Sequence, residues 1–310
     1  MCSHTVSVCA YKQVELLKAI SETHILVATQ SASTFLTMPQ SHPYRNGYSV
    51  LPKLQRIPLS AVFHTDDELR ERCLKAKKEA MATQQVCVRQ DLGGKAEAEI
   101  VNWIHGHYPI ALNGSTLRDF ASQMSEDVIV HCLMESSDAM VFGHVCFPSG
   151  WDPVHAIGKS FEEIHQPVPG MNLKSSRKLV ETIVQHGPFE RFVWSVVFDD
   201  DLNGHPSRPR AEFRPRSGHA LGQQGDLFVK VERQVTVPFG EHRCALFLLQ
   251  QSLIPRQEID QVALARALRK MSDAELRYKR LDQCRDALCH WLESCADSDS
   301  SSRPPIGNER

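Results

Sequence analysis

The stretch FPSGWDPVHAIGKSFEEIHQPVPGMN, residues 147–172, divides an amphipathic front half of the chain from a strand-rich back half. It contains four prolines, three glycines and two histidines. Glycine and proline are the strongest punctuators of the backbone, so this density predicts an irregular but ordered path. Pro167 and Pro169 each fix their own φ and push the preceding residue out of the helical region.

His165 stands just before this stiff Pro-Val-Pro segment. A side chain on a restricted backbone can serve as a metal or cofactor ligand at little entropic cost. The alternative is a tight loop whose histidine is only hydrogen-bonded. Taken by itself, the segment favours this second interpretation.

The composition is that of an ordinary globular protein. The 310 residues carry a formal net charge of -2, and no cluster of Lys and Arg with interleaved aromatic residues suggests a nucleic-acid groove or a polybasic membrane patch. No apolar run approaches the length of a membrane span, and the N-terminus lacks the order of a signal peptide. We therefore expect a soluble, cytoplasmic protein whose ten cysteines are reduced thiols.

The front half predicts mainly helices. Residues 66–81 form a charged pattern typical of a solvated helix, and residues 116–133 give the clearest helical pattern, with Thr116 and Asp119 as a capping box. On such a helix Asp127 and His131 would be neighbours at i and i+4. They are either a surface ion pair or a polar pair facing a pocket, and their position favours the ion pair.

The back half predicts strands at residues 139–147, 192–198, 227–237 and 244–249, the last two as a hairpin in the centre of a sheet. Alternation in the third strand places Arg233 in an apolar row, with Glu232 on the opposite face. A buried guanidinium is costly unless it meets a carboxylate or an anionic ligand. Arg233 therefore either pairs structurally or clamps a carboxylate-bearing ligand.

The connections and ends complete the pattern. Residues 199–225 are polar and rich in glycine and proline, which indicates a mobile surface loop or a lid. Two helices are expected at 258–270 and 274–293, with Ser272 and Glu275 capping the second. A helix and a strand are also expected within residues 14–28. No G-x-G-x-x-G, Walker, G-x-S-x-G, H-E-x-x-H or C-x-x-C motif is present.

Three segments in order resemble the haem-dependent oxidative N-demethylase alpha-subunit-like family, formerly a domain of unknown function. They are SEDVIV (125–130), FPSGWDP…IGKSFEEIHQPVP (147–169) and VKVERQVTVPFGEHRCALFLL (229–249). RFVWSV (191–196) and HGHYP (105–109) are weaker matches. Together they cover roughly residues 60–290 and leave the first 40 or so unexplained.

The resemblance implies an α+β fold, with a PAS-like antiparallel sheet flanked by helices and additional N- and C-terminal helices. Residues 1–55 would be an N-terminal extension, 56–293 the family domain and 294–310 a disordered tail. The domain would hold a b-type haem and use dioxygen to demethylate a small secondary amine, releasing formaldehyde. Electrons would come from a flavin and iron–sulfur reductase, usually on partner chains.

The resemblance also implies roles for particular residues. His165, in the IH-PVP motif, would be the axial ligand of the haem iron. Arg233 would hold a haem propionate or a structural carboxylate, and Lys159 is a further cofactor-binding candidate. Asp127 and Glu232 would pair structurally or receive the cationic amine. His144 and His155 are the candidates for a second ligand on the distal side.

The chain departs from the family pattern at three positions. Ala156 stands where the family usually has a lysine, Lys230 replaces the first arginine of R-V-E-R-Q, and Val193 replaces an asparagine. Lysine cannot reproduce the planar fork of arginine. The alternative function is therefore a non-catalytic haem-binding PAS-type sensor, or a scaffold that has lost haem.

Overall fold

A computed structural model describes residues 42–49, 53–64, 66–90, 92–171, 173–213 and 227–301. The predicted helix and strand within residues 14–28 lie outside these ranges. Seven strands form one antiparallel sheet in the order β1-β5-β6-β7-β3-β4-β2. Their bounds are β1 Gln55–Arg56, β2 Cys87–Arg89, β3 Asp127–Leu133, β4 Asp138–His144, β5 Phe189–Val197, β6 Phe228–Phe239 and β7 Cys244–Pro255.

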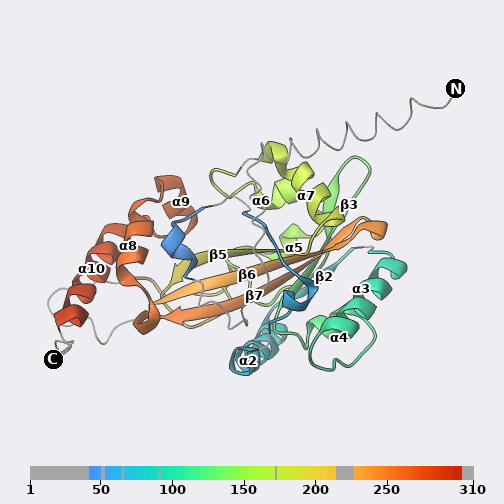
Figure 1. Cartoon of the computed structure of the whole chain (residues 1–310), viewed down its shortest axis with the longest axis horizontal. Helices are drawn as coiled ribbons and strands as arrows, with labels where there is room; N and C mark the ends of the chain where they lie inside the picture. The colour runs from blue at the N-terminus through green and yellow to red at the C-terminus, as the bar shows by residue number, and fades with distance from the viewer. Residues whose placement is uncertain are drawn as a thin grey trace, which may run out of the picture.

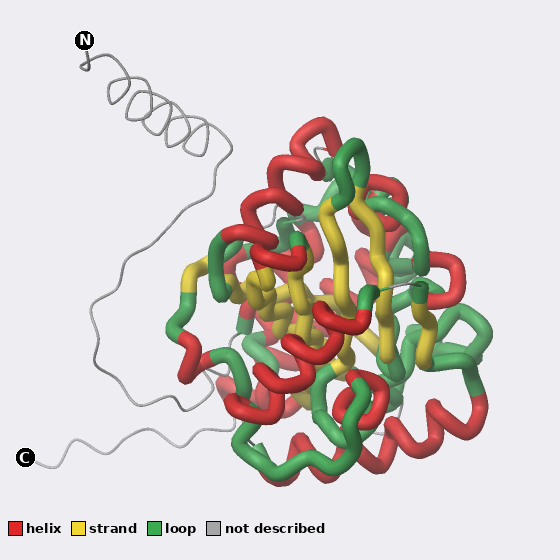
Figure 2. Tube along the Cα trace, turned by 90° about the vertical axis from the view of Figure 1, so that its right-hand side faces the viewer, coloured by secondary structure: helices red, strands yellow, loops and turns green. Residues whose placement is uncertain are grey.

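The helices occupy both sides of this sheet and one of its ends (Figures 1 and 2). Their bounds are α2 Asp67–Thr83, α3 Gly94–His107, α4 Leu117–Ala121, α5 Pro153–Ala156, α6 Phe161–His165, α7 Ser176–Gln185, α8 Gln261–Arg269, α9 Asp273–Tyr278 and α10 Arg285–Ser301. None of the described helices is long and apolar enough to span a membrane. One open antiparallel sheet with helices around it makes the chain an α+β protein.

The long hairpin of β6 and β7 lies in the middle of the sheet, as the alternation of residues 227–237 predicts. A 3-10 turn, Gly240–His242, joins its strands, and Arg243 then adopts a left-handed conformation with φ of 54°. Directly opposite residues in antiparallel strands project to the same side. The register of this hairpin and its neighbours therefore assigns every strand residue to one of two faces.

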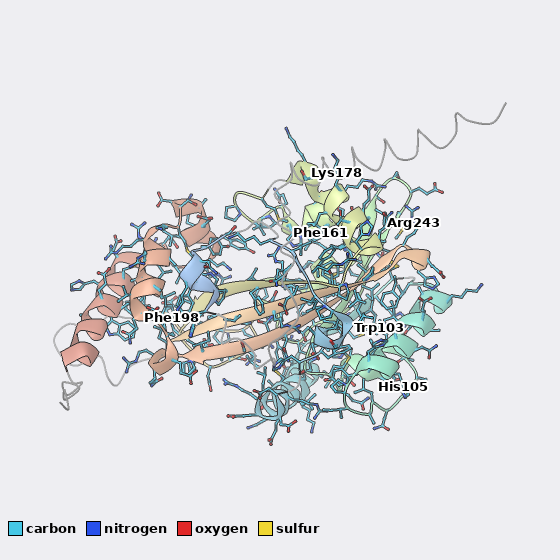
Figure 3. All side chains as sticks on the ribbon, viewed as in Figure 1. Trp103, His105, Phe161, Lys178, Phe198 and Arg243 are labelled. Carbon is cyan, nitrogen blue, oxygen red and sulfur yellow. A yellow bond between two sulfur atoms is a disulfide. The ribbon has the colours of Figure 1, made fainter. Side chains whose placement is uncertain are left out.

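We call these two sides of the sheet the α6 face and the α3 face. The α6 face carries Arg191, Glu232, Gln234, Ile129 and Phe247. It packs against α5, α6 and α7 through Phe161, Val180, Ile183, Ala156 and their neighbours. The α3 face carries Val128, Val130, Arg233, Val235 and Leu246, which pack against α3 and α4. Figure 3 shows Phe161 and Trp103 on opposite sides of the sheet.

The predicted helix at 116–133 is wrong beyond its first turns. The Thr116–Asp119 capping box is present and starts α4, but that helix ends at Ala121 and the chain enters β3 at Asp127. β3 lies between β7 and β4 and is buried on both faces, so its apolar residues do not alternate. A continuous apolar run of this kind satisfies helical spacing by coincidence.

The predicted helix at 274–293 is also wrong, because it is two helices. The Ser272–Glu275 capping box is confirmed at the start of α9, which ends at Tyr278. Arg280 then has a φ of 58°, a left-handed conformation that no helix continues through. α10 begins only at Arg285. The break leaves Tyr278 and Lys279 at a corner between the two helices.

The expectation that all cysteines are reduced thiols is wrong for one pair. Cys132 on β3 and Cys244 on β7 are directly opposite residues on the α3 face and are joined as a disulfide, with their Cα atoms 4.1 Å apart. Their separation of 112 residues hides this proximity in the sequence. Five other described cysteines are free: Cys73, Cys87, Cys146, Cys284 and Cys289.

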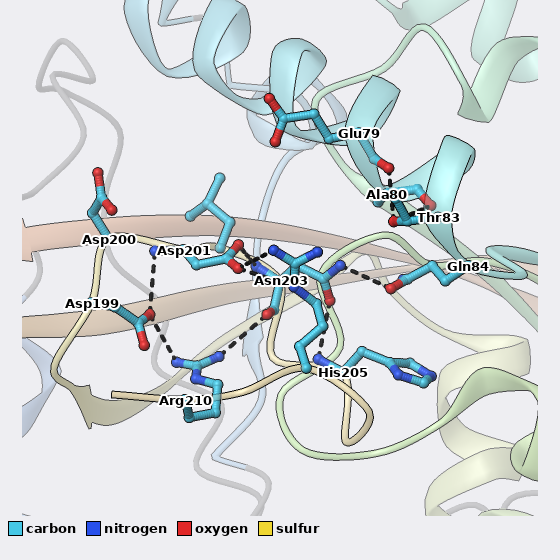
Figure 4. A network of polar contacts seen from close by, with 12 residues as sticks. Glu79, Ala80, Thr83, Gln84, Asp199, Asp200, Asp201, Asn203, His205 and Arg210 are labelled. Carbon is cyan, nitrogen blue, oxygen red and sulfur yellow. Dashed lines mark hydrogen bonds and ion pairs between the residues drawn. The ribbon is translucent and has the colours of Figure 1, made fainter. Parts of the chain in front are cut away.

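The first part of the polar loop at 199–225 is held in place by ion pairs (Figure 4). Arg208 binds Asp201 at 2.6 Å, and Arg210 lies 3.5 Å from Asp199. Asn203 donates to the Gln84 side chain at the C-cap of α2. Gly204 also bridges to Ser149 in the proline-rich stretch. Residues 199–213 are therefore fastened to both α2 and that stretch, while residues 214–226 lie outside the described ranges.

Candidate functional site

β4 sets the position of His165 through the first turn of α6. Asp138 accepts a hydrogen bond from the Phe161 backbone N–H at 2.6 Å and another from the His131 ring at 2.5 Å. A Ser160–Glu163 capping box also fixes the start of α6. The Phe161 carbonyl then accepts from Nδ1 of His165 at 2.8 Å, and the two rings stack with centroids 3.9 Å apart.

This arrangement determines which nitrogen of His165 is available. The bond to a carbonyl requires that Nδ1 carries the proton, so Nε2 holds the lone pair when the ring is neutral. None of the described residues forms a hydrogen bond with Nε2. Burial lowers the pKa of His165 to about 4, and the charges of Arg191 and His131 add to the effect. The imidazole is therefore neutral at pH 7, with a fixed ring and a free Nε2.

The middle of the α6 face is incompletely covered. Ile129 and Phe247 are opposite residues in two inner strands, yet both are only half-buried, while the residues beside them in the strands are buried. Arg191, Val193 and Gln234 on the same face are also half-buried. Apolar and polar side chains thus remain accessible beneath the helices that carry His165.

Glu232 places a carboxylate on the half-buried part of this face. Its side chain accepts hydrogen bonds from the amides of Gln234 and Gln251 and from the Ser149 hydroxyl at 3.4 Å. Glu232 is 8 % exposed, and its charge acts on His165, Arg191 and Lys279. It is therefore held by neutral donors rather than by a direct ion pair within the described residues.

Two cations lie near Glu232. Arg191 of β5 and Lys279, which follows α9, are both half-buried. The Lys279 ammonium lies 5.2 Å from the centre of the Tyr48 ring and 5.5 Å from that of Tyr278. Burial lowers the pKa of Arg191 and lowers that of Lys279 to about 8. Both remain protonated at pH 7.

Arg233 does not lie on this face. Its guanidinium donates to Glu190 at 2.6 Å and to the backbone carbonyls of Ala61 and Val62, all on the α3 side. Of the two interpretations left open by the sequence, these contacts support the structural pairing.

Asp127 is likewise engaged in the fold. Its carboxylate accepts from the backbone N–H groups of Cys146 and Phe147, at 2.9 and 2.8 Å, and lies 3.5 Å from the Lys77 ammonium. Burial raises its pKa, and Lys77 opposes that shift. Lys77 itself is fully buried, so the predicted solvated helix at 66–81 buries one of its charges. Asp127 therefore ties the start of the proline-rich stretch to α2 and β3.

The remaining candidates lie away from Nε2 of His165. Lys159 exposes its side chain to solvent, and only its backbone pairs with the rest of the fold, at Met140 and Ala156. His144 is buried opposite Val128 on the α3 face, and burial lowers its pKa to about 3. The His155 side chain is 79 % exposed and lies 3.0 Å from Asp152.

A family model described as haem-dependent oxidative N-demethylase, alpha subunit-like, matches residues 88–289. The chain belongs to this family. The match runs from within β2 into α10, and thus includes His165, Arg191, Glu232 and Lys279. A search of curated proteins finds no match.

The positions at which this N-demethylase-like chain departs from the family pattern have distinct surroundings. Val193 lies directly opposite Glu232 on the α6 face. Lys230 is buried, donates to the Leu202 carbonyl at 2.6 Å, and has a pKa lowered to about 8 by burial. Ala156 packs in the apolar cluster under α5. Of the three, Val193 is the one that lies on the half-buried part of the face.

The sequence did not single out Arg191 or Lys279. The apolar row of Phe192, Trp194 and Val196 does imply that Arg191 points to the opposite side, which is the available signal. The sequence gives no such signal for Lys279, because its pattern predicts one continuous helix over residues 274–293. Its place depends on the left-handed Arg280 that ends α9.

Proposed function

We propose that this chain is a haem-dependent oxidative N-demethylase that acts on a small secondary amine and releases formaldehyde. The observation that carries the proposal is the His165 side chain, with Nδ1 fixed by the Phe161 carbonyl and Nε2 free. Histidines that bind metal characteristically donate their other ring N–H to a carbonyl or a carboxylate. Membership of the family supplies the identity of the cofactor.

The residues around His165 fit a haem. Ile129 and Phe247 offer apolar surface at the sheet centre, and the Arg191 and Lys279 cations are suited to the carboxylates of such a group. We propose that His165 would be the axial ligand and that the α6 face would hold the porphyrin. When bound, the haem would supply the activation of dioxygen, with electrons from a flavin and iron–sulfur reductase partner.

The sheet topology supports the PAS-like assignment. Five adjacent strands run in the order β4-β3-β7-β6-β5, and α5, α6 and α7 connect β4 to β5. We propose that these elements are a PAS-like core, to which α2–α4 and α8–α10 are added. The cofactor would lie between the core sheet and its connecting helices.

The side chains of the chain have separate tasks in the reaction. Glu232 would attract the cationic amine, and the amides of Gln234 and Gln251 keep its carboxylate in place. Ile129, Val193 and Phe247 would exclude water from the methyl group. The overall reaction consumes the amine, dioxygen, two electrons and two protons. It yields the demethylated amine, formaldehyde and water, so one oxygen atom enters each of the last two products.

The test compares His165→Ala with His155→Ala after reconstitution with hemin. His165→Ala is expected to lose the Soret band and at least about a hundredfold of the formaldehyde formed from dimethylamine, dioxygen and a reductase. His155→Ala is the matched control because its ring is exposed. An unchanged spectrum in His165→Ala would remove the ligand assignment. Haem and carbon monoxide binding without formaldehyde from any amine tested would indicate the non-catalytic sensor.

A further inference from the structure

Arg191 and Lys279 bring two positive charges to one part of the α6 face. Arg191 comes from β5, which is near the edge of the sheet, and Lys279 comes from the corner after α9. Both lie near Tyr48: the Lys279 ammonium is 5.2 Å from the centre of the Tyr48 ring, and the Arg191 charge acts on Tyr48 as well as on Lys279 and His165. Two chain segments almost ninety residues apart therefore meet at this point.

Among the described residues, neither cation has an anionic partner of its own. Within the described ranges, no carboxylate forms an ion pair or a hydrogen bond with Arg191 or Lys279, and Glu232 is the acidic side chain whose charge they feel. Glu232 already accepts from two amides and a hydroxyl. Half-buried cations without a partner are costly, and a guanidinium binds a planar carboxylate particularly well.

Two aromatic side chains lie beside the Lys279 ammonium. Tyr48 and Tyr278 flank the Lys279 ammonium, and Trp194, which projects to the other side of β5 from Arg191, packs edge-on against Tyr48 with centroids 5.8 Å apart. The rings limit where the ammonium can go, and no hydrogen-bond acceptor among the described residues pairs with it. Arg277, also near the end of α9, is by contrast exposed and provides a matched control.

We propose that Arg191 and Lys279 form a carboxylate-binding site that anchors a ligand on the α6 face. This inference rests on the proposed function, since the ligand expected first is the haem with its two carboxylates. A carboxylate on the amine substrate is the other source of the same chemistry. Arg233 takes no part, because it lies on the opposite side of the sheet and is fully engaged there.

The first experiment uses protoporphyrin IX without iron, together with its dimethyl ester, so that binding does not depend on His165. We expect Arg191→Gln and Lys279→Met each to weaken binding of the diacid about tenfold or more and to leave binding of the diester unchanged. The affinity of Arg191→Lys for the diacid should fall between those of the wild type and Arg191→Gln. Arg277→Gln should bind the diacid as tightly as the wild type does. Thermal unfolding of each variant checks that it is folded.

The second experiment titrates N-methylglycine and dimethylamine into the protein by calorimetry. If the site takes a substrate carboxylate, the variants lose at least about tenfold in affinity for N-methylglycine alone, and porphyrin binding is unaffected. If neither the diacid nor N-methylglycine distinguishes the variants from the wild type, the carboxylate site is overturned. A failure of the proposed function would give a different result: hemin would bind equally well to the wild type and to His165→Ala.

Discussion

Two arginines on adjacent strands illustrate how strongly a single residue's place determines its role. Arg191 on β5 and Arg233 on β6 are both charged residues within apolar strands, yet they project to opposite faces. Arg233 is 6 % exposed and pairs with Glu190 and two carbonyls, whereas Arg191 is half-buried and has no anionic partner among the described residues. The alternation shows that Arg233 and Glu232 diverge, but it does not show which side carries the site.

Arg233→Met should therefore affect stability rather than the cofactor. It leaves Glu190 and the Ala61 and Val62 carbonyls without their donor, and removing one partner of a largely buried pair costs about 3 kcal/mol. We expect a lower urea midpoint and an unchanged hemin affinity for the folded protein. A loss of hemin affinity without a loss of stability would place Arg233 in the binding site instead.

The buried Lys77–Asp127 pair gives a second prediction at the same scale. Lys77→Met leaves the Asp127 carboxylate in the core without its counter-charge, so the free energy of unfolding should fall by about 3–5 kcal/mol. Lys78→Met removes the exposed neighbouring charge and should change it by less than about 0.5 kcal/mol. Adding Asp127→Asn to Lys77→Met should recover part of the loss, as measured by urea unfolding. An additive further loss would show that the two charges are not coupled.

At the scale of elements, the predicted helices and strands are correct where local signals in the sequence determine them, and wrong where burial in the folded chain does. The helix at 66–81, both capping boxes and the β6–β7 hairpin depend on capping, periodicity and turn residues, which the sequence displays. β3 is covered on both faces, and α9 ends because Arg280 adopts a left-handed backbone conformation. Neither feature produces a periodic pattern in the sequence. The proposed site depends on both, because β3 carries Ile129 and the corner after α9 carries Lys279.

The Cys132–Cys244 disulfide gives the prediction at this scale, because it joins the inner strands β3 and β7. A cross-link of this kind restricts the unfolded chain, and its removal typically costs about 2–4 kcal/mol. The double variant Cys132→Ala and Cys244→Ala should unfold at correspondingly lower urea concentrations. A reducing agent should shift the wild type toward the variant and leave the variant unchanged. Peptide mapping without reduction should recover the linked pair; finding two free thiols instead would contradict the assignment.

Considered as a whole, the molecule has structural contacts on one side of its sheet and the proposed site on the other. The α3 face holds Arg233 and the disulfide, and it packs against α3 and α4. The α6 face holds Glu232, Arg191 and the free nitrogen of His165. The family motifs make His165 and Glu232 candidates from the sequence alone, but the meeting of β5, α6 and the end of α9 exists only in the folded chain.

Two histidines predict how the whole protein responds to acid. Burial lowers the pKa of His144 to about 3 and that of His165 to about 4, whereas an unfolded histidine titrates near 6.5. Between these values the unfolded chain binds protons that the folded chain does not, so stability falls as the pH falls from about 6.5 toward 4 and below. For His144, which is 1 % exposed, the loss between pH 7 and pH 5 should be about 2 kcal/mol.

Urea unfolding at pH 7 and pH 5 measures this loss, and His144→Leu should reduce it by about 2 kcal/mol relative to the wild type. The absolute stability of the variant does not matter, because the difference between the two pH values is the readout. His155→Gln is the matched control and should retain the full loss, since the His155 ring is exposed and a surface ion pair contributes little. An equal pH dependence in His144→Leu and in the wild type would mean that His144 is not held neutral in the folded protein.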